Sequence, residues 1–310
     1  MSDSGSRTVV LTALAGNAAI ALSKYGAALL TGSAAMLAEA IHSSIDTGNQ
    51  GLMLLGMARA RKPPDSDRPF GYGNEVYFWS FMVAVLLFTV GSGLSIADGI
   101  DHLLNPAPVS DPWVNYGVLA LGFVFEGTSW FVAAREFNRI KGRWGVFEAI
   151  HRGKDPNKFL VLFEDTAALA GLALALAGLI AAQLTGNEIF DALASIGIGV
   201  ILALVSIGLA VETRSLLIGE SANPQVVDAI REVLNAEAAV ARVNEIATLH
   251  FGPEFVLATI SVRFRAGLSG RELQNAIERM DRQIKARYAL VQRIFIEAEY
   301  EADTVPVDPE

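Results

Sequence analysis

Long apolar runs separated by short polar segments occupy the first two thirds of the chain. A membrane-spanning helix needs about 20 mostly apolar residues, and six runs reach that length: Val9–Leu30, Ser33–Ala58, Val76–Ile96, Trp113–Ala134, Phe159–Leu184 and Ile189–Val211. Very short segments join the first run to the second and the fifth to the sixth, so two tight helical hairpins are expected. The pattern predicts an α-helical membrane protein with six transmembrane helices.

A different pattern begins near Gly219. Asn223-Pro224 has the residue types of a helix cap and first turn, and Ser269 with Glu272 forms a capping-box pattern before an amphipathic helix. Alternation of apolar and polar positions predicts strands, and three are expected: Val240–Phe251, Glu254–Arg265 and Val291–Ala298. The order helix, strand, strand, helix, strand predicts a small α+β (ferredoxin-like) domain with its helices on one face of a sheet.

The expected organisation is a six-helix transmembrane domain over residues 1–214, a cytoplasmic α+β domain over 215–300 and an acidic tail over 301–310. The cytoplasmic placement follows from the basic residues, which gather in cytoplasmic loops. Two loops carry them: Arg59, Arg61, Lys62 and Arg68 in one, and Arg135, Arg139, Lys141, Arg143, Arg152, Lys154 and Lys158 in the other. The three loops on the opposite side carry none, so both termini are expected in the cytoplasm.

Composition supports a membrane protein and narrows its chemistry. The chain is 52% hydrophobic, with a mean hydropathy of +0.39, which is too apolar for an ordinary soluble domain. It contains no cysteine, so neither disulfides nor thiolate metal ligands are possible, and its net charge of −9 argues against a nucleic-acid partner. The first apolar run is longer than the apolar region of a cleaved signal peptide, so we interpret it as an uncleaved helix.

Candidate chemistry lies inside the second apolar run, at His42 and Asp46. Both residue types are costly in a membrane helix. A spacing of four places them on one helix face, and imidazole nitrogen and carboxylate oxygen are both zinc ligands. The alternative is a polar contact between helices, because polar side chains also hold membrane helices together.

Glu164 and Asp165 lie near the start of the fifth run. Adjacent residues project about 100° apart on a helix, so one carboxylate could bind an ion while the other meets a basic loop residue or water. Asn49 lies three residues after Asp46 and could be an outer ligand or a helix contact.

Four further ionisable residues have weaker interpretations. Lys24, in the first run, is expected to extend its ammonium toward a membrane interface. Glu126 is alone in the fourth run and is interpreted as a gating or inter-helix hydrogen-bonding group. Asp98 and Asp101 are expected near the outer mouth, where they either attract cations or are simply solvated.

Taken together, six spans, His-x-x-x-Asp on the second, acidic residues on the fifth and a small α+β tail resemble the cation diffusion facilitator family. The stretch Asp67-Arg68-Pro69-Phe70-Gly71-Tyr72-Gly73 is similar to the Asp-His-Pro-Phe-Gly-Tyr-Gly stretch of that family. The Glu-Asp-Thr-Ala-Ala-Leu stretch that starts at Glu164 resembles a distinct branch, which includes an animal zinc transporter-like protein. The resemblance covers nearly the whole chain.

The resemblance implies a homodimer that exchanges a divalent metal ion, usually zinc, for protons. It implies a transporter rather than an enzyme, with zinc as transported substrate and no cofactor. Export across a bacterial inner membrane is the expected role, and the 215–300 domain is expected to dimerise.

The family's intramembrane site takes two ligands from span two and two from span five. By this resemblance His42 and Asp46 match the first pair, and Asp165 matches the second member of the other pair. The first member falls at Val161, which cannot bind metal. The fourth ligand is therefore left open between Glu164, Asn49 and water.

Other metal positions of the family also differ in this chain. Arg68 and Tyr72 stand where many members have histidines, and His250 is the one histidine of the C-terminal domain. A binuclear zinc site in that domain is therefore not expected, and His250 is interpreted as a surface or strand histidine.

Three alternatives to zinc transport remain at this point. The first is a transporter selective for iron, cobalt, manganese or cadmium, because the protein environment rather than raw affinity sets selectivity. The second is a membrane metal sensor that does not transport. The third, an intramembrane metalloenzyme, is disfavoured because the chain has no His-Glu-x-x-His motif.

Overall fold

The computed structural model describes residues 3–106, 109–141, 145 and 157–299. They divide into two compact units: unit 1 is Met1–Ala58 with Val76–Arg214, and unit 2 is Arg59–Glu75 with Ser215–Glu310. The segment 59–75, which the sequence analysis assigned to the transmembrane domain, therefore belongs to unit 2. The expected acidic tail lies outside the described residues.

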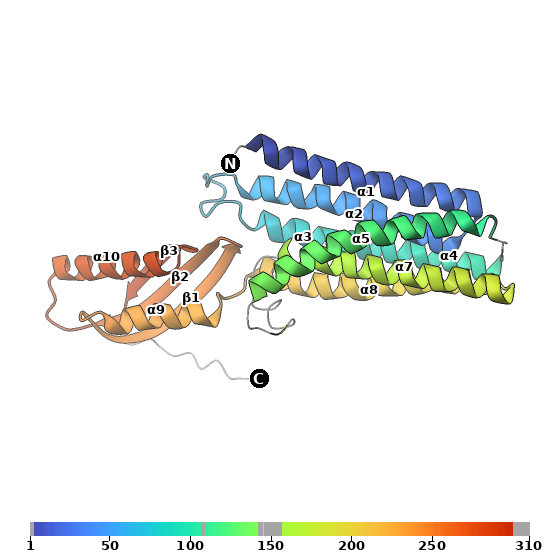
Figure 1. Ribbon diagram of the computed structural model, residues 1–310. Helices are drawn as coiled ribbons and strands as arrows, with labels where there is room; N and C mark the ends of the chain where they lie inside the picture. Colours follow the sequence, from blue (N-terminus) through green and yellow to red (C-terminus); the bar gives the residue numbers. More distant parts are fainter. Residues whose placement is uncertain (1–2, 107–108, 142–144, 146–156, 300–310) are drawn as a thin grey trace. The chain divides into compact units, whose positions relative to one another are not determined.

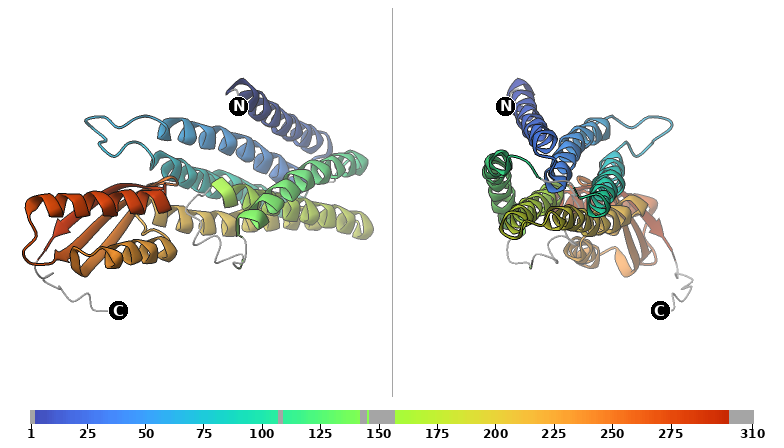
Figure 2. Two further views of the ribbon diagram at one scale, coloured as in Figure 1. Left: turned by 60° about the vertical axis from the view of Figure 1, so that its left-hand side comes forward. Right: turned by 90° about the vertical axis from the view of Figure 1, so that its right-hand side faces the viewer.

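Unit 1 is a bundle of long helices that run side by side (Figures 1 and 2). Its elements are α1 (Asp3–Thr31), α2 (Ala34–Ala60), α3 (Glu75–Leu86), η1 (Leu87–Ser92), α4 (Gly93–Leu104), α5 (Pro112–Lys141), α7 (Asn157–Thr185) and α8 (Ile189–Ile218). Each predicted apolar run is helical over nearly its whole length, and the third run, Val76–Ile96, extends over α3, η1 and the start of α4. The η1 segment is a π-helical turn inside the third run, and α4 beyond it meets α8 where Ser195 Oγ donates to the Ser95 carbonyl at 2.9 Å.

Four helical segments in the described part of the chain are long and apolar enough to cross a membrane: Glu75–Leu104, Pro112–Arg139, Leu160–Thr185 and Ile189–Ile218. The α2 helix has 27 residues, but Glu39, His42 and Asp46 lower its mean hydropathy. The structure thus shows a multi-pass helical domain with four such segments.

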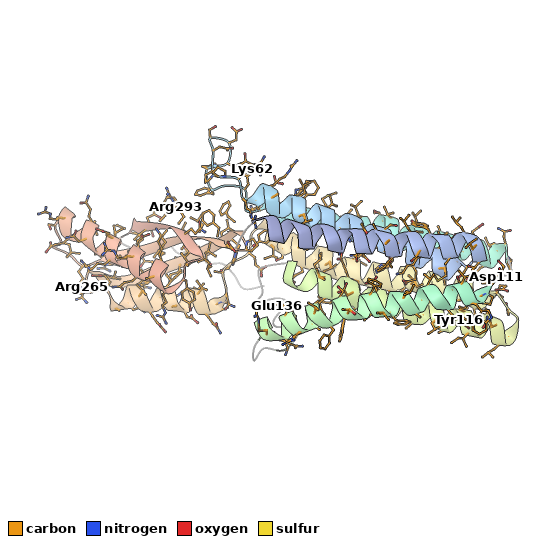
Figure 3. All side chains as sticks on the ribbon, turned by 45° about the horizontal axis from the view of Figure 1, so that its top comes forward. Lys62, Asp111, Tyr116, Glu136, Arg265 and Arg293 are labelled. Carbon is orange, nitrogen blue, oxygen red and sulfur yellow. The ribbon has the colours of Figure 1, made fainter. Side chains whose placement is uncertain are left out.

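The interior of unit 1 is mostly apolar, whereas polar pairs lie toward the helix ends. Core residues include Met36, Leu119, Leu172 and Ile198. Figure 3 shows Tyr116 and Glu136 toward opposite ends of α5. The Tyr116 hydroxyl donates to Gln183 Oε1 at 2.7 Å, and Glu136 pairs with Arg139 at 2.7 Å. Buried charged residues also occur within the bundle, among them Lys24, Glu39 and Glu164.

Unit 2 contains α9 (Pro224–Ala236), β1 (Val240–Gly252), β2 (Phe255–Phe264), α10 (Gly270–Arg287) and β3 (Val291–Ala298). The sheet order is β1-β2-β3, with β1 and β2 antiparallel and β2 and β3 parallel. The predicted α+β domain is confirmed, and the finer ferredoxin-like assignment stays a prediction. Both predicted caps form: Asn223 accepts from Gln225 N at 3.1 Å, and Ser269 with Glu272 makes a capping box.

One core joins both helices of unit 2 to the sheet. Alternate residues of β2, namely Val256, Ala258, Ile260 and Val262, pack with apolar residues of α9 and α10 such as Ile230, Leu234, Met280 and Ile284. Alternate residues of a strand point to the same face, so α9 and α10 cover the same face of the sheet, as predicted.

The segment 59–75 packs within unit 2 against the β1–β2 turn. The rings of Phe70 and Phe251 lie 5.1 Å apart, and those of Phe251 and Phe255 lie 5.8 Å apart. The backbone approaches closely at Gly73, where an added Cβ would lie 2.0 Å from the Phe251 carbonyl oxygen. A side chain at position 73 therefore cannot be placed without moving the turn.

Candidate functional site

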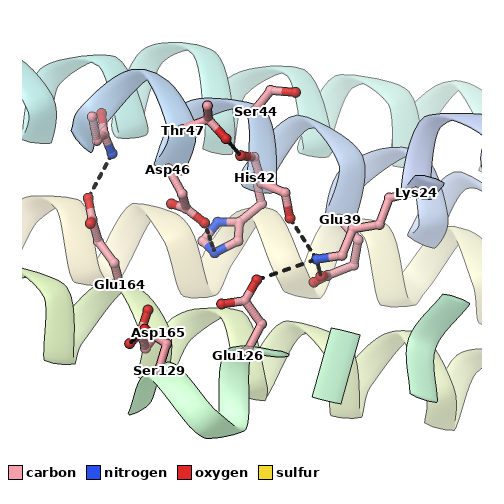
Figure 4. A network of polar contacts seen from close by, with 12 residues as sticks. Lys24, Glu39, His42, Ser44, Asp46, Thr47, Glu126, Ser129, Glu164 and Asp165 are labelled. Carbon is pink, nitrogen blue, oxygen red and sulfur yellow. Dashed lines mark hydrogen bonds and ion pairs between the residues drawn. The ribbon is translucent and has the colours of Figure 1, made fainter. Parts of the chain in front are cut away.

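His42 and Asp46 lie on the same face of α2, as their spacing predicts, and point toward the acidic residues of α5 and α7 (Figure 4). His42 Nε2 lies 3.2 Å from Asp46 Oδ2, and the side chains are 1% and 15% exposed. Neither ring nitrogen of His42 makes a hydrogen bond among the described residues, nor does Asp46 Oδ1. Buried polar atoms in proteins almost always have a hydrogen-bond partner. This pair is therefore the kind of exception that a ligand site produces.

Glu164 and Asp165 on α7 are both buried but face different neighbours. Glu164 Oε1 accepts from Asn49 Nδ2 of α2 at 2.7 Å, and Asp165 Oδ2 accepts from Ser129 Oγ of α5 at 2.7 Å. The two carboxylates diverge as adjacent helical residues must. Each meets a neutral side chain of another helix.

The structure brings four of the predicted ligands together in two pairs and leaves the fifth apart. His42 pairs with Asp46, and Asn49 pairs with Glu164. Asp165 instead contacts Ser129. No group of three or more His, Asp or Glu side chains in the described residues lies close enough to hold a metal ion as arranged. Zinc usually takes four ligands, so a complete site requires the carboxylates of α7 to turn toward the His42–Asp46 pair.

The expectation that Lys24 extends toward a membrane interface is wrong. Its side chain is fully buried, and Nζ lies 2.9 Å from Glu39 Oε2 and 2.7 Å from Ser43 Oγ. Glu126 Oε1 lies 4.0 Å from the same nitrogen, so the inter-helix contact expected of Glu126 is made to Lys24. The Glu39 carboxylate of the next helix compensates the ammonium for the water that it loses on burial.

Two positioning contacts of the site could not be found from the sequence. Trp130 Nε1 of α5 donates to Thr166 Oγ1 at 2.9 Å, next to the Asp165–Ser129 contact. Asp191 of α8 accepts from Ser33 Oγ and Ala34 N, both at 2.6 Å. Asp191 thus caps the start of α2, where a negative charge also complements the helix dipole. Neither contact follows a local sequence pattern.

The carboxylates expected near the outer mouth have local partners. Asp98 Oδ2 lies 3.6 Å from His102 Nδ1, and Asp101 Oδ1 accepts from Asn105 Nδ2 at 3.0 Å. These contacts within one helical segment neither require nor indicate a bound cation.

In segment 59–75, the residues at the family's histidine positions form a small polar cluster. Asp65 accepts hydrogen bonds from the Tyr72 hydroxyl and from the backbone of Asp67 and Arg68, and the Arg68 guanidinium lies 4.9 Å from the centre of the Tyr72 ring. The hydrogen bond from Tyr72 holds the pKa of the Asp65 carboxyl below its usual value. Arg68 and Tyr72 are thus held by a hydrogen-bonded turn and a cation–π contact.

His250 lies on β1 and is buried rather than at the surface. Its Nδ1 is 3.2 Å from the Gly252 carbonyl oxygen. The interpretation as a strand histidine is confirmed.

Residues 10–218 match the family model described as the cation efflux transmembrane domain. The chain is 34% identical over 250 residues to the human "Proton-coupled zinc antiporter SLC30A9, mitochondrial", an alignment that covers 80% of this chain and 44% of that protein. It is 33% identical over 288 residues to "Metal tolerance protein C4" of Arabidopsis thaliana, covering 91% of this chain and 62% of that protein. The chain thus spans about half the length of the curated relatives it matches.

The helical bundle and the match over residues 10–218 define a cation efflux membrane protein, and the chain belongs to the cation diffusion facilitator family. Within the family it falls in the branch of the SLC30A9 proteins, as the Glu-Asp-Thr-Ala-Ala-Leu stretch suggested.

Proposed function

We propose that the chain moves a divalent transition-metal ion, zinc by preference, across a membrane in exchange for protons. The observation that carries the proposal is the buried His42–Asp46 pair, whose unpartnered atoms face the acidic residues of α7. A bound cation would give these atoms the partner that the described protein groups do not. The printed name of the human relative, a proton-coupled zinc antiporter, supports the same cargo and the same coupling ion.

The proposed ligands are His42, Asp46 and Asp165, with Glu164, Asn49 or water in the fourth position. One imidazole nitrogen with carboxylate oxygens is a donor set that suits zinc. When the ion binds, Asp165 would give up its hydrogen bond from the Ser129 hydroxyl and contact the metal instead. Ser129 and Asn49 then act as partners of the α7 carboxylates when the ion is absent.

Proton coupling follows from the chemistry of these ligands. Only neutral imidazole and ionised carboxylate bind a metal, so metal binding expels any protons that the groups hold. Protons arriving from the outer side would displace the ion there, and the higher pH of the cytoplasm would favour metal capture. The same groups thus carry either the ion or the protons in turn.

The proposal includes six spans, with α1 and α2 joining the four apolar segments, cytoplasmic termini, a bacterial inner membrane and a homodimer. The one-sided basic loops support this orientation. Because the chain lacks cysteine, single cysteines at Asn105 or Asn187 should be labelled from outside intact cells, and one at Ser66 should not. The reverse labelling would contradict the orientation and the export direction. The mass of the purified full chain in detergent tests the dimer.

Zinc flux in proteoliposomes tests the transport itself. An imposed pH gradient should drive zinc uphill in the unmodified protein, and Asp165→Asn should abolish that flux. The partly exposed carboxylate Asp281 on α10 pairs with Lys285, so Asp281→Asn is a control outside the bundle. Zinc binding without flux would favour the metal sensor, and flux that ignores the pH gradient would contradict antiport.

The same assay over several metals tests the role of His42. Replacing imidazole with carboxylate in His42→Asp leaves only oxygen ligands, which suit harder ions. The expected result is retained binding, with the preference for zinc over manganese reduced about tenfold or more. An unchanged preference would show that His42 is not a ligand.

A further inference from the structure

The Lys24 ammonium is fully buried inside the bundle and is held by polar groups of other helices. The side chain is 0% exposed, and its Nζ is surrounded by oxygens of two other helices: Glu39 Oε2 at 2.9 Å, Ser43 Oγ at 2.7 Å and Glu126 Oε1 at 4.0 Å. Figure 4 shows this cluster next to His42 and Asp46. A buried ammonium is costly, and it persists only where good partners surround it.

We propose that Lys24 is a specificity-determining residue that occupies the place of a second cation. Its ammonium lies between the carboxylates of Glu39 and Glu126 and thereby limits the neighbouring His42–Asp46 site to one divalent ion. The inference rests on the proposed function, because it concerns a second metal ion that Lys24 keeps from binding beside the proposed transport site.

Without the ammonium, the oxygens around it would form a site for a different class of metal ion. Glu39, Ser43 and Glu126 offer oxygen atoms only, and such donor sets favour hard cations such as calcium and manganese. Glu39 Oε1 is buried and accepts no hydrogen bond among the described residues. The cluster thus holds more acceptor capacity than the ammonium uses.

The packing around Glu39 fixes the carboxylate in this position. A Cβ added to Gly171 of α7 would lie 2.3 Å from Glu39 Oε1. The carboxylate therefore lies directly against the backbone of the helix that carries Glu164 and Asp165. Glycine at position 171 is required for this approach, so the position of Glu39 depends on a specific residue of another helix.

The excess of negative charge around Lys24 explains why its ammonium is needed there. Five buried or partly buried carboxylates lie on the facing parts of α2, α5 and α7, namely Glu39, Asp46, Glu126, Glu164 and Asp165. Among the residues that the structure describes, Lys24 supplies the ammonium in contact with two of them, Glu39 and Glu126. Glu39 lies three residues before His42, and residues at this spacing are about 5–6 Å apart on a helix. A second divalent ion there would repel an ion at the His42–Asp46 site, and we expect it to bind only where loss of the ammonium leaves the Glu39 and Glu126 carboxylates uncompensated.

Equilibrium dialysis of the purified full chain with zinc, manganese or calcium tests the proposal. Lys24→Met should bind one manganese or calcium ion per chain beyond the number bound by the unmodified protein, and its preference for zinc should fall about tenfold. Lys24→Arg keeps the positive charge and should retain the original stoichiometry. An unchanged stoichiometry and metal preference in Lys24→Met would overturn the proposal.

Two further variants separate this proposal from the proposed function. Lys24→Met/Glu39→Gln lacks one of the freed carboxylates and should lose the extra ion. Asp46→Asn should lose zinc binding, whereas Lys24→Met/Asp46→Asn should still bind one manganese ion. Retained zinc flux in Asp46→Asn would contradict the proposed transport site but not the role of Lys24. If Lys24→Met fails to fold, millimolar manganese during purification should restore folded protein, and failure of that rescue would count against the proposal.

Discussion

The same residue types have opposite environments in the two units, and the histidines show this most simply. His42 in α2 is buried, with its Nε2 3.2 Å from Asp46 Oδ2 and its Nδ1 without a hydrogen-bond partner among the described residues. His250 in β1 is buried as well, but its Nδ1 lies 3.2 Å from the Gly252 carbonyl oxygen. Burial is common to both, so burial alone does not indicate function. His42 is proposed as a ligand because its Nε2 meets a carboxylate and its Nδ1 has no hydrogen-bond partner among the described residues.

The ion pairs show the same contrast. Lys24 and Glu39 lie on different helices and are both fully buried. Arg279 and Glu237 also come from different elements of unit 2, but the Arg279 side chain is 51% exposed. Arg279 holds the pKa of Glu237 below its usual value through a hydrogen bond. Exposed pairs contribute little to stability, whereas breaking a buried pair leaves an uncompensated charge.

The largest expected effect comes from removing a proposed ligand in unit 1. Asp46→Asn removes a charged oxygen beside His42, and zinc flux in proteoliposomes should fall at least about 100-fold, because even outer-shell changes at metal sites cost 10–100-fold. Asp281→Asn, at a partly exposed carboxylate of unit 2, should leave flux within about twofold. Similar effects of the two substitutions would break the comparison.

The next effect concerns the cap of α2. Asp191→Ala removes a buried carboxylate that accepts from Ser33 Oγ and Ala34 N, and the expected loss is about 2–3 kcal/mol, since hydrogen bonds to charged groups are the strong ones. Asn187, which caps the start of its own helix through Ile189 N at 3.1 Å, is the control. Asn187→Ala should cost about 1 kcal/mol or less, measured as thermal stability of the full chain in detergent.

A third prediction tests whether unit 2 also contains intolerant positions. Gly73→Ala places a Cβ against the Phe251 carbonyl, so the segment or the turn must shift, at an expected cost of about 1–3 kcal/mol. Gly270 has open space around it, and Gly270→Ala should be nearly neutral. Equal thermal stability of the two variants would show that segment 59–75 does not pack closely in solution.

The smallest effect is expected at the Arg279–Glu237 ion pair, whose side chains are 51% and 9% exposed. Glu237→Gln should cost only about 0.5–1 kcal/mol. Because the pKa of Glu237 is lowered in the folded protein, the pair stabilises unit 2 above the ordinary pKa of a glutamate. That contribution is lost as the pH falls through the lowered pKa. Glu278→Gln, in a more exposed pair with Arg282, should show a weaker pH dependence in the same denaturation experiment.

Local signals in the sequence predicted unit 2 well. Alternation of apolar residues along β2 and the capping residues Asn223 and Ser269 act within a few positions of each other. Such patterns can be recognised without knowing what packs against them.

The site was harder to predict from the sequence, because its contacts join distant parts of the chain. Lys24 was expected at an interface, since nothing near it in sequence shows that Glu39 of the next helix faces it at 2.9 Å. Asp191 caps α2 from 157 residues away. Helix rotation and register decide both contacts, and amphipathic periodicity is weak in helices that are apolar on most faces.

The π-helical turn η1, Leu87–Ser92, sets the phase of the helix that follows it. Such a turn accommodates one residue more than a regular turn, and one residue corresponds to about 100° of rotation on an α-helix. Deleting a single residue there would leave a continuous helix but would rotate α4 relative to α3. The Ser95 carbonyl would then turn away from Ser195. In a comparison of related genes, a one-residue gap at this position would therefore mark a change in the face that α4 presents to α8, even where every other residue is retained.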